Sequence, residues 1–189
     1  MKLALDTGSW EMWVNPNCTA AASKPVCMNN GNYMPNVSTR KTNLGADFDI
    51  RYGSGFASGV YWQDWLYLRE MNIVIEQKFG VANNSEYVTS GILGLGYGID
   101  INTDYLTPLD NLVRYNWIYA PIYAIDLGGQ GDGFSMYPSA PIARKEGKRV
   151  LMFSGEIVFG GLNRYRYRGN LEPVPIWPAV KDQQAYWVQ

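Results

Sequence analysis

Leu5-Asp6-Thr7-Gly8-Ser9 is the stretch from which the rest of this chain can be interpreted. The apolar residues Leu3 and Leu5 predict the end of a buried strand, and Asp6 follows at the point where that strand must stop. Gly8 allows a close backbone approach that a side chain would block. A carboxylate under apolar cover is costly unless it is paired or hydrogen-bonded, so we interpret Asp6 as a functional acid. The alternative is an ordinary turn, since all four residue types from Asp6 to Ser9 favour turns.

The composition narrows the chemistry that is open to the chain. Its 189 residues include no histidine and two cysteines. These numbers exclude a Ser-His-Asp triad, a Cys-His pair, a His-ligated zinc site and a four-thiolate site. Any catalysis must therefore come from carboxylates, hydroxyls, lysines or tyrosines, and we expect neither a metal nor a cofactor. The net charge of -1 gives no basic field, so we expect no nucleic-acid partner.

The sequence predicts an all-β fold with one or two short helices in a single domain. Fourteen per cent of the residues are aromatic, and 20 glycines and 10 prolines favour short strands joined by turns. Phe48 and Ile50 alternate with charged residues, which predicts a β-hairpin over residues 47–68 with a glycine-rich tip. We expect further strands at 11–15, 71–82, 119–127 and 155–161, a polar loop at 15–43 and a helix at 106–115.

The glycine-spaced apolar run at residues 90–98 could be mistaken for a phosphate-binding loop. A helix does not follow it at the required place, and it carries no Walker lysine. We therefore predict a buried strand whose glycines admit another backbone closely.

Cys18 and Cys27 are close together in the polar loop, and three glycosylation sequons begin at Asn17, Asn36 and Asn83. A disulfide across this short loop would stabilise the fold by roughly 2–3 kcal/mol. The alternative is two free thiols in a cytosolic protein. Together these features favour a secreted protein, or a vacuolar or cell-surface one reached through the secretory pathway.

No apolar run is long enough to span a bilayer, and residues 1–5 are too short for a signal peptide. If the protein is secreted, we expect its true N-terminus to lie outside this sequence.

Five stretches together resemble the N-terminal lobe of pepsin-like aspartic proteases, peptidase family A1, with loops and sequons in a fungal style. They occur in the family's order and at family-like spacings, at residues 5–14, 50–55, 79–82, 91–97 and 155–161. The resemblance implies a lobe of strongly twisted sheets, or a partly open β-barrel, with a hairpin that closes over the substrate.

The resemblance also implies a role for each residue of the opening stretch. Asp6 resembles the first catalytic aspartate, and Thr7 and Gly8 complete the loop that holds it. Ser9 resembles the hydroxyl that hydrogen-bonds the outer oxygen of this aspartate. Peptide hydrolysis by such a site needs a base to activate water and an acid to protonate the substrate, and two neighbouring carboxylates can supply both.

Substrate-binding residues follow from the same resemblance. The tip of the flap, the hairpin end that closes over substrate, would consist of Tyr52, Gly53, Ser54 and Gly55, with Trp13 as the partner of Tyr52. Phe79 and Ile92 would line pockets for substrate side chains. Cys18 and Cys27 match the small disulfide loop of the family.

The chain departs from the family because it has one Asp-Thr-Gly and no Asp-Ser-Gly. The remaining candidate acids lack that loop context: Asp100, Asp104, Asp110, Asp126 and Asp132. We therefore expect residues 1–189 to be an N-terminal lobe without its first strands, truncated before the second aspartate. Residues 185–189 would begin the crossover into a missing C-terminal lobe.

The leading hypothesis is an aspartic endopeptidase that acts on peptide or protein substrates and is poorly active as this chain alone. A first alternative is a non-catalytic peptide-binding relative or an inactive fragment. A second is a homodimeric protease in the retroviral manner, in which Asp6 meets its symmetry mate. A third is a carbohydrate- or nucleic-acid-binding β-domain that uses tyrosines and tryptophans. The Arg–Tyr alternation at 164–168 could stack on single-stranded nucleic acid, but because the chain has no wider basic field we predict an edge strand or a turn with surface cation–π contacts there.

Overall fold

A computed structural model describes most of the first 128 residues and three segments beyond them. The described residues are 1–15, 18, 21, 23–53, 55–86, 91–98, 103–128, 142–145, 148–151 and 155–174. The chain divides into two compact units, one of residues 1–117 with 173–189 and one of residues 118–172.

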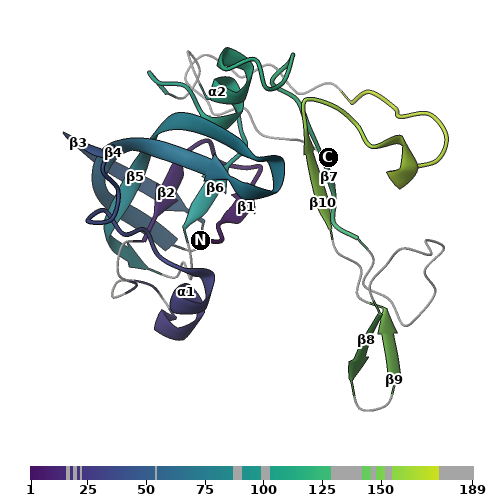
Figure 1. The fold of residues 1–189 in the computed structure, drawn as a ribbon, viewed down its shortest axis with the longest axis horizontal. Coiled ribbons are helices and arrows are strands. Elements are labelled where there is room, and N and C mark those ends of the chain that lie inside the picture. The colour runs from purple at the N-terminus through teal and green to yellow at the C-terminus, as the bar shows by residue number, and fades with distance from the viewer. Residues whose placement is uncertain are drawn as a thin grey trace. The chain divides into compact units, whose positions relative to one another are not determined.

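A six-stranded mixed sheet forms the first unit (Figure 1). Its strands in spatial order are β1 (Ala4–Asp6), β6 (Ile92–Gly94), β2 (Met12–Val14), β5 (Ile73–Glu86), β4 (Gly55–Leu68) and β3 (Thr42–Tyr52). Two neighbouring pairs are parallel, β1 with β6 and β2 with β5, and the other pairs are antiparallel. The predicted predominance of strands, with only short helices, is confirmed.

Strand β2 connects two hydrophobic clusters because neighbouring side chains on a strand point to opposite faces. Trp13 packs with Phe48, Ala57, Ala82 and Ile92 in the first cluster. Met12 and Val14 pack with Phe79 and Val81 in the second cluster. All three β2 side chains are buried, so β2 lies at the centre of the core.

The predicted hairpin is present and longer than expected, because β3 and β4 pair from Thr42 to Gln63 around an irregularity between Asn43 and Asp47. Tyr52 pairs with Gly55 at the end of the hairpin, where the prediction placed its tip. β4 continues into a second antiparallel pairing with β5, reached through a single 3-10 turn, η1 (Arg69–Met71).

Strand β1 corrects one expectation, since the sequence predicted that Leu3 and Leu5 end a buried strand. Leu5 is 47% exposed, and β1 is the outermost strand of the sheet, paired only with β6. A strand with one neighbour leaves much of its surface to solvent, whatever its residue types. Leu3 is half-buried and contacts the second cluster.

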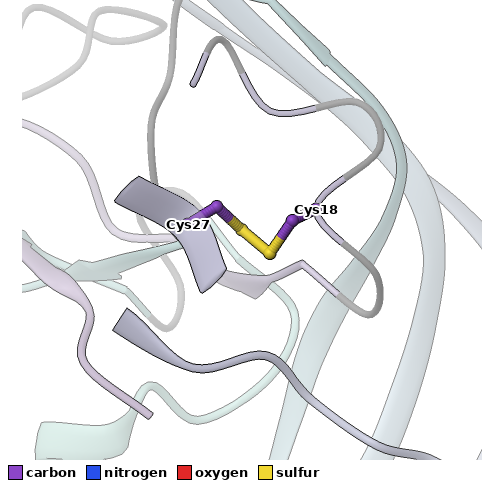
Figure 2. The surroundings of a disulfide bond; sticks show 2 residues. All are labelled: Cys18 and Cys27. Carbon is purple, nitrogen blue, oxygen red and sulfur yellow. A yellow bond between two sulfur atoms is a disulfide. The ribbon is translucent and has the colours of Figure 1, made fainter. Parts of the chain in front are cut away.

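A short helix corrects the second expectation, because residues 15–43 were predicted to be a polar loop. α1 (Lys24–Asn30) begins after Ser23, with Pro25 in its first turn where a missing N–H costs nothing. Cys27 is the buried residue of α1, and a disulfide joins it to Cys18 with the Cα atoms 5.6 Å apart (Figure 2). The predicted disulfide is confirmed.

We expect the double substitution Cys18→Ser and Cys27→Ser to lower the free energy of unfolding by about 2.5 kcal/mol, because it removes a constraint on the unfolded chain. Urea unfolding of the oxidised protein and the double variant measures this difference. A change below about 0.5 kcal/mol would contradict the loop-entropy account.

The predicted helix at 106–115 is α2 (Pro108–Arg114). Thr107 caps it reciprocally, since its side chain accepts from the backbone N–H of Asp110 while the Asp110 carboxylate accepts from the backbone N–H of Thr107. Asn111 donates to the buried side chain of Gln77 on β5 at 2.9 Å, which joins α2 to the sheet.

In its described residues, the second unit has two antiparallel strand pairs. β7 (Tyr123–Asp126) pairs with β10 (Glu156–Phe159), and β8 (Ile142–Lys145) pairs with β9 (Lys148–Leu151). The Arg–Tyr segment, predicted as an edge strand or a turn, forms the 3-10 turn η2 (Arg164–Arg166).

Candidate active site

The Asp6 loop, residues 6–9, lies against the segment that follows β6. The backbone N–H of Leu95 donates to the carbonyl of Asp6 at 2.8 Å, and that of Gly96 donates to the carbonyl of Ser9 at 2.9 Å. A Cβ on Gly94 would lie 2.4 Å from the carbonyl carbon of Trp10, so only glycine fits there. The prediction that glycines in 90–98 admit another backbone is confirmed, and that backbone carries Asp6.

Each oxygen of the Asp6 carboxylate accepts a hydrogen bond from its own loop. The N–H of Gly8 donates to Oδ1 at 2.9 Å, and the hydroxyl of Ser9 donates to Oδ2 at 2.6 Å. Asp6 is half-buried, Ser9 is buried, and Thr7 and Gly8 are exposed in the turn. Charge-assisted bonds of this kind are among the stronger ones in proteins, so the carboxylate is oriented while it stays accessible to solvent.

Tyr52 brings the end of the hairpin to the Asp6 loop. The indole N–H of Trp13 donates to the Tyr52 hydroxyl at 2.7 Å, and Ser9 also hydrogen-bonds this hydroxyl. Burial raises the pKa of Tyr52 to about 12, with the charge of Asp6 as a further cause, so its hydroxyl stays protonated. A chain of polar contacts therefore runs from Trp13 through Tyr52 and Ser9 to Asp6.

The other predicted flap residues surround the turn of the hairpin. Gly53 is exposed in the turn, and a Cβ on it would meet no atom within 4 Å. Gly55 begins β4 opposite Tyr52. Ser54 lies outside the described residues.

The two residues predicted to line substrate pockets are both buried. Ile92 is 8% exposed and belongs to the cluster of Trp13, against which Tyr52 packs. Phe79 is 4% exposed and belongs to the other cluster, where its ring meets that of Tyr33 edge-on at 5.3 Å. Ile92 is therefore near the candidate site, and Phe79 has little free surface. Their role toward substrate stays a prediction.

Sequence reasoning missed the buried acid beside the site, Glu11. The hydroxyl of Tyr61 donates to its Oε1 at 2.7 Å, and the hydroxyl of Tyr105 donates to its Oε2. Burial raises the pKa of the Glu11 carboxyl, while these hydroxyls and the Lys78 cation lower it. The sequence feature that could have indicated Glu11 is its position, an acidic residue between Trp10 and the buried residues of β2.

The remaining aspartates have partners of their own where the structure describes them. Asp104 lies 3.7 Å from the Lys78 ammonium, Asp110 caps α2, and Asp126 lies 3.5 Å from the guanidinium of Arg166. Asp100 and Asp132 lie outside the described residues. Asp126 also accepts from the backbone N–H of Gly128 at 2.9 Å, as Asp6 does from Gly8, but its other oxygen pairs with Arg166 where that of Asp6 accepts from the Ser9 hydroxyl.

A hollow with a volume of about 280 Å³ lies in residues 118–172. Its acids are Asp126 and Glu156, and Arg166 pairs with both, at 3.5 and 3.2 Å. Because one guanidinium neutralises both carboxylates, this hollow is a weaker candidate for acid–base chemistry than the Asp6 loop.

Two of the sequon asparagines, Asn36 and Asn83, are exposed, and Asn17 lies outside the described residues. Their glycosylation stays a prediction. Within the described ranges, no three cysteine, aspartate or glutamate side chains gather as a metal site would require. No helix in that same part of the chain has the length and apolar character to cross a membrane.

A family model described as eukaryotic aspartyl protease matches residues 1–138, which include the Asp6 loop and the hairpin. Vacuolar protease A of Aspergillus fumigatus is 30% identical over 98% of this chain and 42% of its own length. Cathepsin E-B of Xenopus laevis is 30% identical over 96% of the chain and 41% of its own length. Secreted aspartic protease 4 of Candida albicans is 30% identical over 93% of the chain and 39% of its own length. The chain thus spans about two-fifths of the length of these curated relatives.

Proposed function

Because this chain belongs to the eukaryotic aspartyl protease family, we propose that it is the Asp6-bearing lobe of an aspartic endopeptidase. The observation that carries the proposal is the Asp6 carboxylate, which accepts hydrogen bonds from Gly8 and Ser9 and lies beside the Tyr52 end of the hairpin. The substrate class is an extended peptide or an unfolded stretch of protein.

The proposed reaction is the attack of a water molecule on a peptide carbonyl. A base must take a proton from the water, and an acid must protonate the carbonyl oxygen and later the leaving amine. Two adjacent carboxylates supply both functions, since like charges so close cannot both ionise and the pair shares a proton. Such a pair titrates as a unit, and aspartic proteases are its standard example.

Asp6 is suited to one half of this pair. Gly8 and Ser9 donate to different oxygens of its carboxylate and fix its plane without covering it. An oriented, accessible carboxylate can hold a water by its remaining lone pairs.

We further propose that the second carboxylate comes from outside these 189 residues, on a C-terminal lobe of the same protein. The chain has one Asp-Thr-Gly and no Asp-Ser-Gly, and its relatives are more than twice as long as the part it matches. In this assignment residues 1–189 form an N-terminal lobe, and 185–189, which lie outside the described residues, lead to the second lobe.

The hairpin end, Tyr52 to Gly55, is proposed as the flap. Closing it over a bound peptide would exclude water and strengthen polar contacts in the site. Tyr52 is anchored by the Trp13 indole, so the flap is supported from the core of the lobe.

We expect Tyr52→Phe to lower the free energy of unfolding by about 1 kcal/mol, because it leaves the buried Trp13 indole N–H without its acceptor. The double variant Tyr52→Phe with Trp13→Phe should cost less than the sum of the two single changes, since the two side chains share one hydrogen bond. Urea unfolding of the four proteins checks this, and strict additivity would show that the bond adds nothing.

The relatives named above as vacuolar and secreted proteases support a route through the secretory pathway for this protein. The disulfide fits an oxidising compartment. A carboxylate pair that must share a proton works at acidic pH, which is consistent with an acidic compartment as the destination of the protein.

The test is a fusion of residues 1–189 to the C-terminal part of Aspergillus vacuolar protease A that lies beyond the matched region. The fusion is incubated at mildly acidic pH with an unstructured protein, with a polysaccharide and with single-stranded DNA, each in a separate assay. We expect cleavage of the protein alone, seen as new peptides by mass spectrometry. Binding of sugar or DNA by a folded fusion that leaves the protein uncut would favour the non-proteolytic alternatives.

A further inference from the structure

Glu11 is an acid that the proposed reaction does not use. It lies two residues beyond the Asp6 loop and two residues before Trp13, and it is 8% exposed. A buried carboxylate needs donors to offset its lost hydration, and Glu11 has two tyrosine hydroxyls. They come from different elements, Tyr61 from β4 and Tyr105 from the segment before α2.

A cation completes this cluster, which we call the Glu11 network. The Lys78 ammonium of β5 lies 4.4 Å from the ring centroid of Tyr61 and 4.5 Å from that of Tyr105. It also lies 3.7 Å from the carboxylate of Asp104. The centroids of the two tyrosine rings lie 5.7 Å apart. One carboxylate and one cation therefore connect the residue before β2 with β4, β5 and the segment before α2.

We propose that Glu11 is a positioning residue whose protonation state sets where the hairpin holds Tyr52 over the Asp6 loop. This inference rests on the proposed function. Glu11 directly precedes the strand of Trp13, and through Tyr61 the Glu11 network is attached to the strand that pairs with β3. Tyr61 packs against the first cluster, where its ring lies 5.6 Å from that of Phe48.

The two states of Glu11 differ in how many hydrogen bonds it can accept. The ionised carboxylate only accepts, and it satisfies both tyrosine hydroxyls at once. The protonated acid carries an O–H that must donate, so one tyrosine has to turn and become an acceptor or lose its partner. Either change moves Tyr61 or Tyr105 and, through β4, the hairpin that ends at Tyr52.

Four neighbours influence the titration of Glu11. Tyr61, Tyr105 and Lys78 favour its charged form, whereas Asp104 opposes it, and the Glu11 charge in turn raises the pKa of Tyr52. Burial is the largest cause and raises the pKa of Glu11 above 4.5. Glu11 therefore takes up a proton more readily than an exposed glutamate does.

The indole N–H of Trp13 is the probe, because it donates to Tyr52 and gives its own resonance in a ¹⁵N–¹H spectrum. The seven tryptophans are distinguished by the loss of one signal in Trp13→Phe. The titration is made in the Asp6→Asn background, so that Asp6 contributes nothing. The chain has no histidine, so no imidazole titrates between about pH 5 and 8.

We expect the Trp13 indole shift to follow a single inflection above pH 4.5 that Glu11→Gln removes. Glu86→Gln, the same change on an exposed residue of β5, should leave the inflection in place. Tyr61→Phe removes one donor to the carboxylate and should move the inflection to higher pH. An inflection that persists in Glu11→Gln, or a flat Trp13 profile in the parent, overturns the proposal.

The pH dependence of stability gives a second measurement if Glu11→Gln proves hard to purify. A carboxyl with a raised pKa binds more protons in the folded state than in the unfolded state, so stability falls as pH rises from about 4.5 through the raised pKa. Tyr61→Phe should extend this fall to higher pH. A curve that Tyr61→Phe leaves unchanged counts against the network.

Neither measurement requires peptide cleavage. Failure of the Trp13 titration therefore removes the role of Glu11 and leaves the proposed function intact, whereas failure of the fusion to cleave protein leaves the titration interpretable.

Discussion

Asp6→Asn is expected to lower kcat/KM for peptide hydrolysis by the fusion by at least about 10³-fold, which is the largest effect of any single change here. Asparagine keeps the size of the side chain and an oxygen that can accept from Gly8 or Ser9. It cannot take a proton from water, and it cannot share one with a second carboxylate. The loss should appear in kcat with little change in KM, because the substrate contacts remain.

Two matched variants make this loss specific. Asp47→Asn makes the same chemical change on an exposed residue of β3 and should leave kcat/KM within about twofold. Ser9→Ala removes one of the two donors to Asp6 and should cost about tenfold. An Asp6→Asn fusion that keeps more than about a tenth of its activity would mean that another acid performs the reaction.

Trp13→Ala should lower the free energy of unfolding by about 3–5 kcal/mol, the range for truncating a buried aromatic residue. Trp13 is 0% exposed and packs against Phe48, Ala57 and Ile92, so its removal opens a cavity at the centre of the first cluster. The Tyr52 hydroxyl also loses its donor. Urea unfolding of parent and variant gives the difference.

Trp13→Phe separates the loss of packing from the loss of the hydrogen bond. Phenylalanine fills most of the cavity but cannot donate a hydrogen bond to the Tyr52 hydroxyl. We expect it to cost about 1–2 kcal/mol. If both variants cost the same small amount, the first cluster does not depend on this side chain, and the Tyr52 anchor must be sought elsewhere.

The sequence predicted the hairpin and the glycine-rich strand better than it predicted the edges of the fold. Asp-Thr-Gly-Ser by itself is also an ordinary turn, so the role of the Asp6 loop was predicted from the resemblance of five stretches to pepsin-like aspartic proteases. The hairpin could be predicted because Phe48 and Ile50 alternate with charged residues. The close approach at Gly94 could be predicted because an apolar run rarely carries so many glycines unless another backbone needs the space.

The features that were predicted wrongly or not predicted depend on contacts between residues distant in the sequence, which a local sequence pattern does not reveal. Leu5 is exposed because of where β1 lies in the sheet order, which depends on pairings with distant residues. α1 has little apolar periodicity, and its buried residue is the cysteine that a disulfide holds. The donors to Glu11 lie 50 and 94 residues away, so only the fold brings them to the carboxylate.

Asp6 is proposed to work as one half of a carboxylate pair whose other half lies outside this chain. The most direct measurement compares peptide release from an unstructured protein at mildly acidic pH by the purified 189-residue chain, by the fusion, and by the Asp6→Asn form of each. The account predicts cleavage by the fusion, loss of that cleavage in its Asp6→Asn form, and for the chain alone a rate at least about 10²-fold lower. Robust cleavage by the chain alone that Asp6→Asn abolishes would contradict the account, and sedimentation would then show whether two copies of Asp6 form the pair.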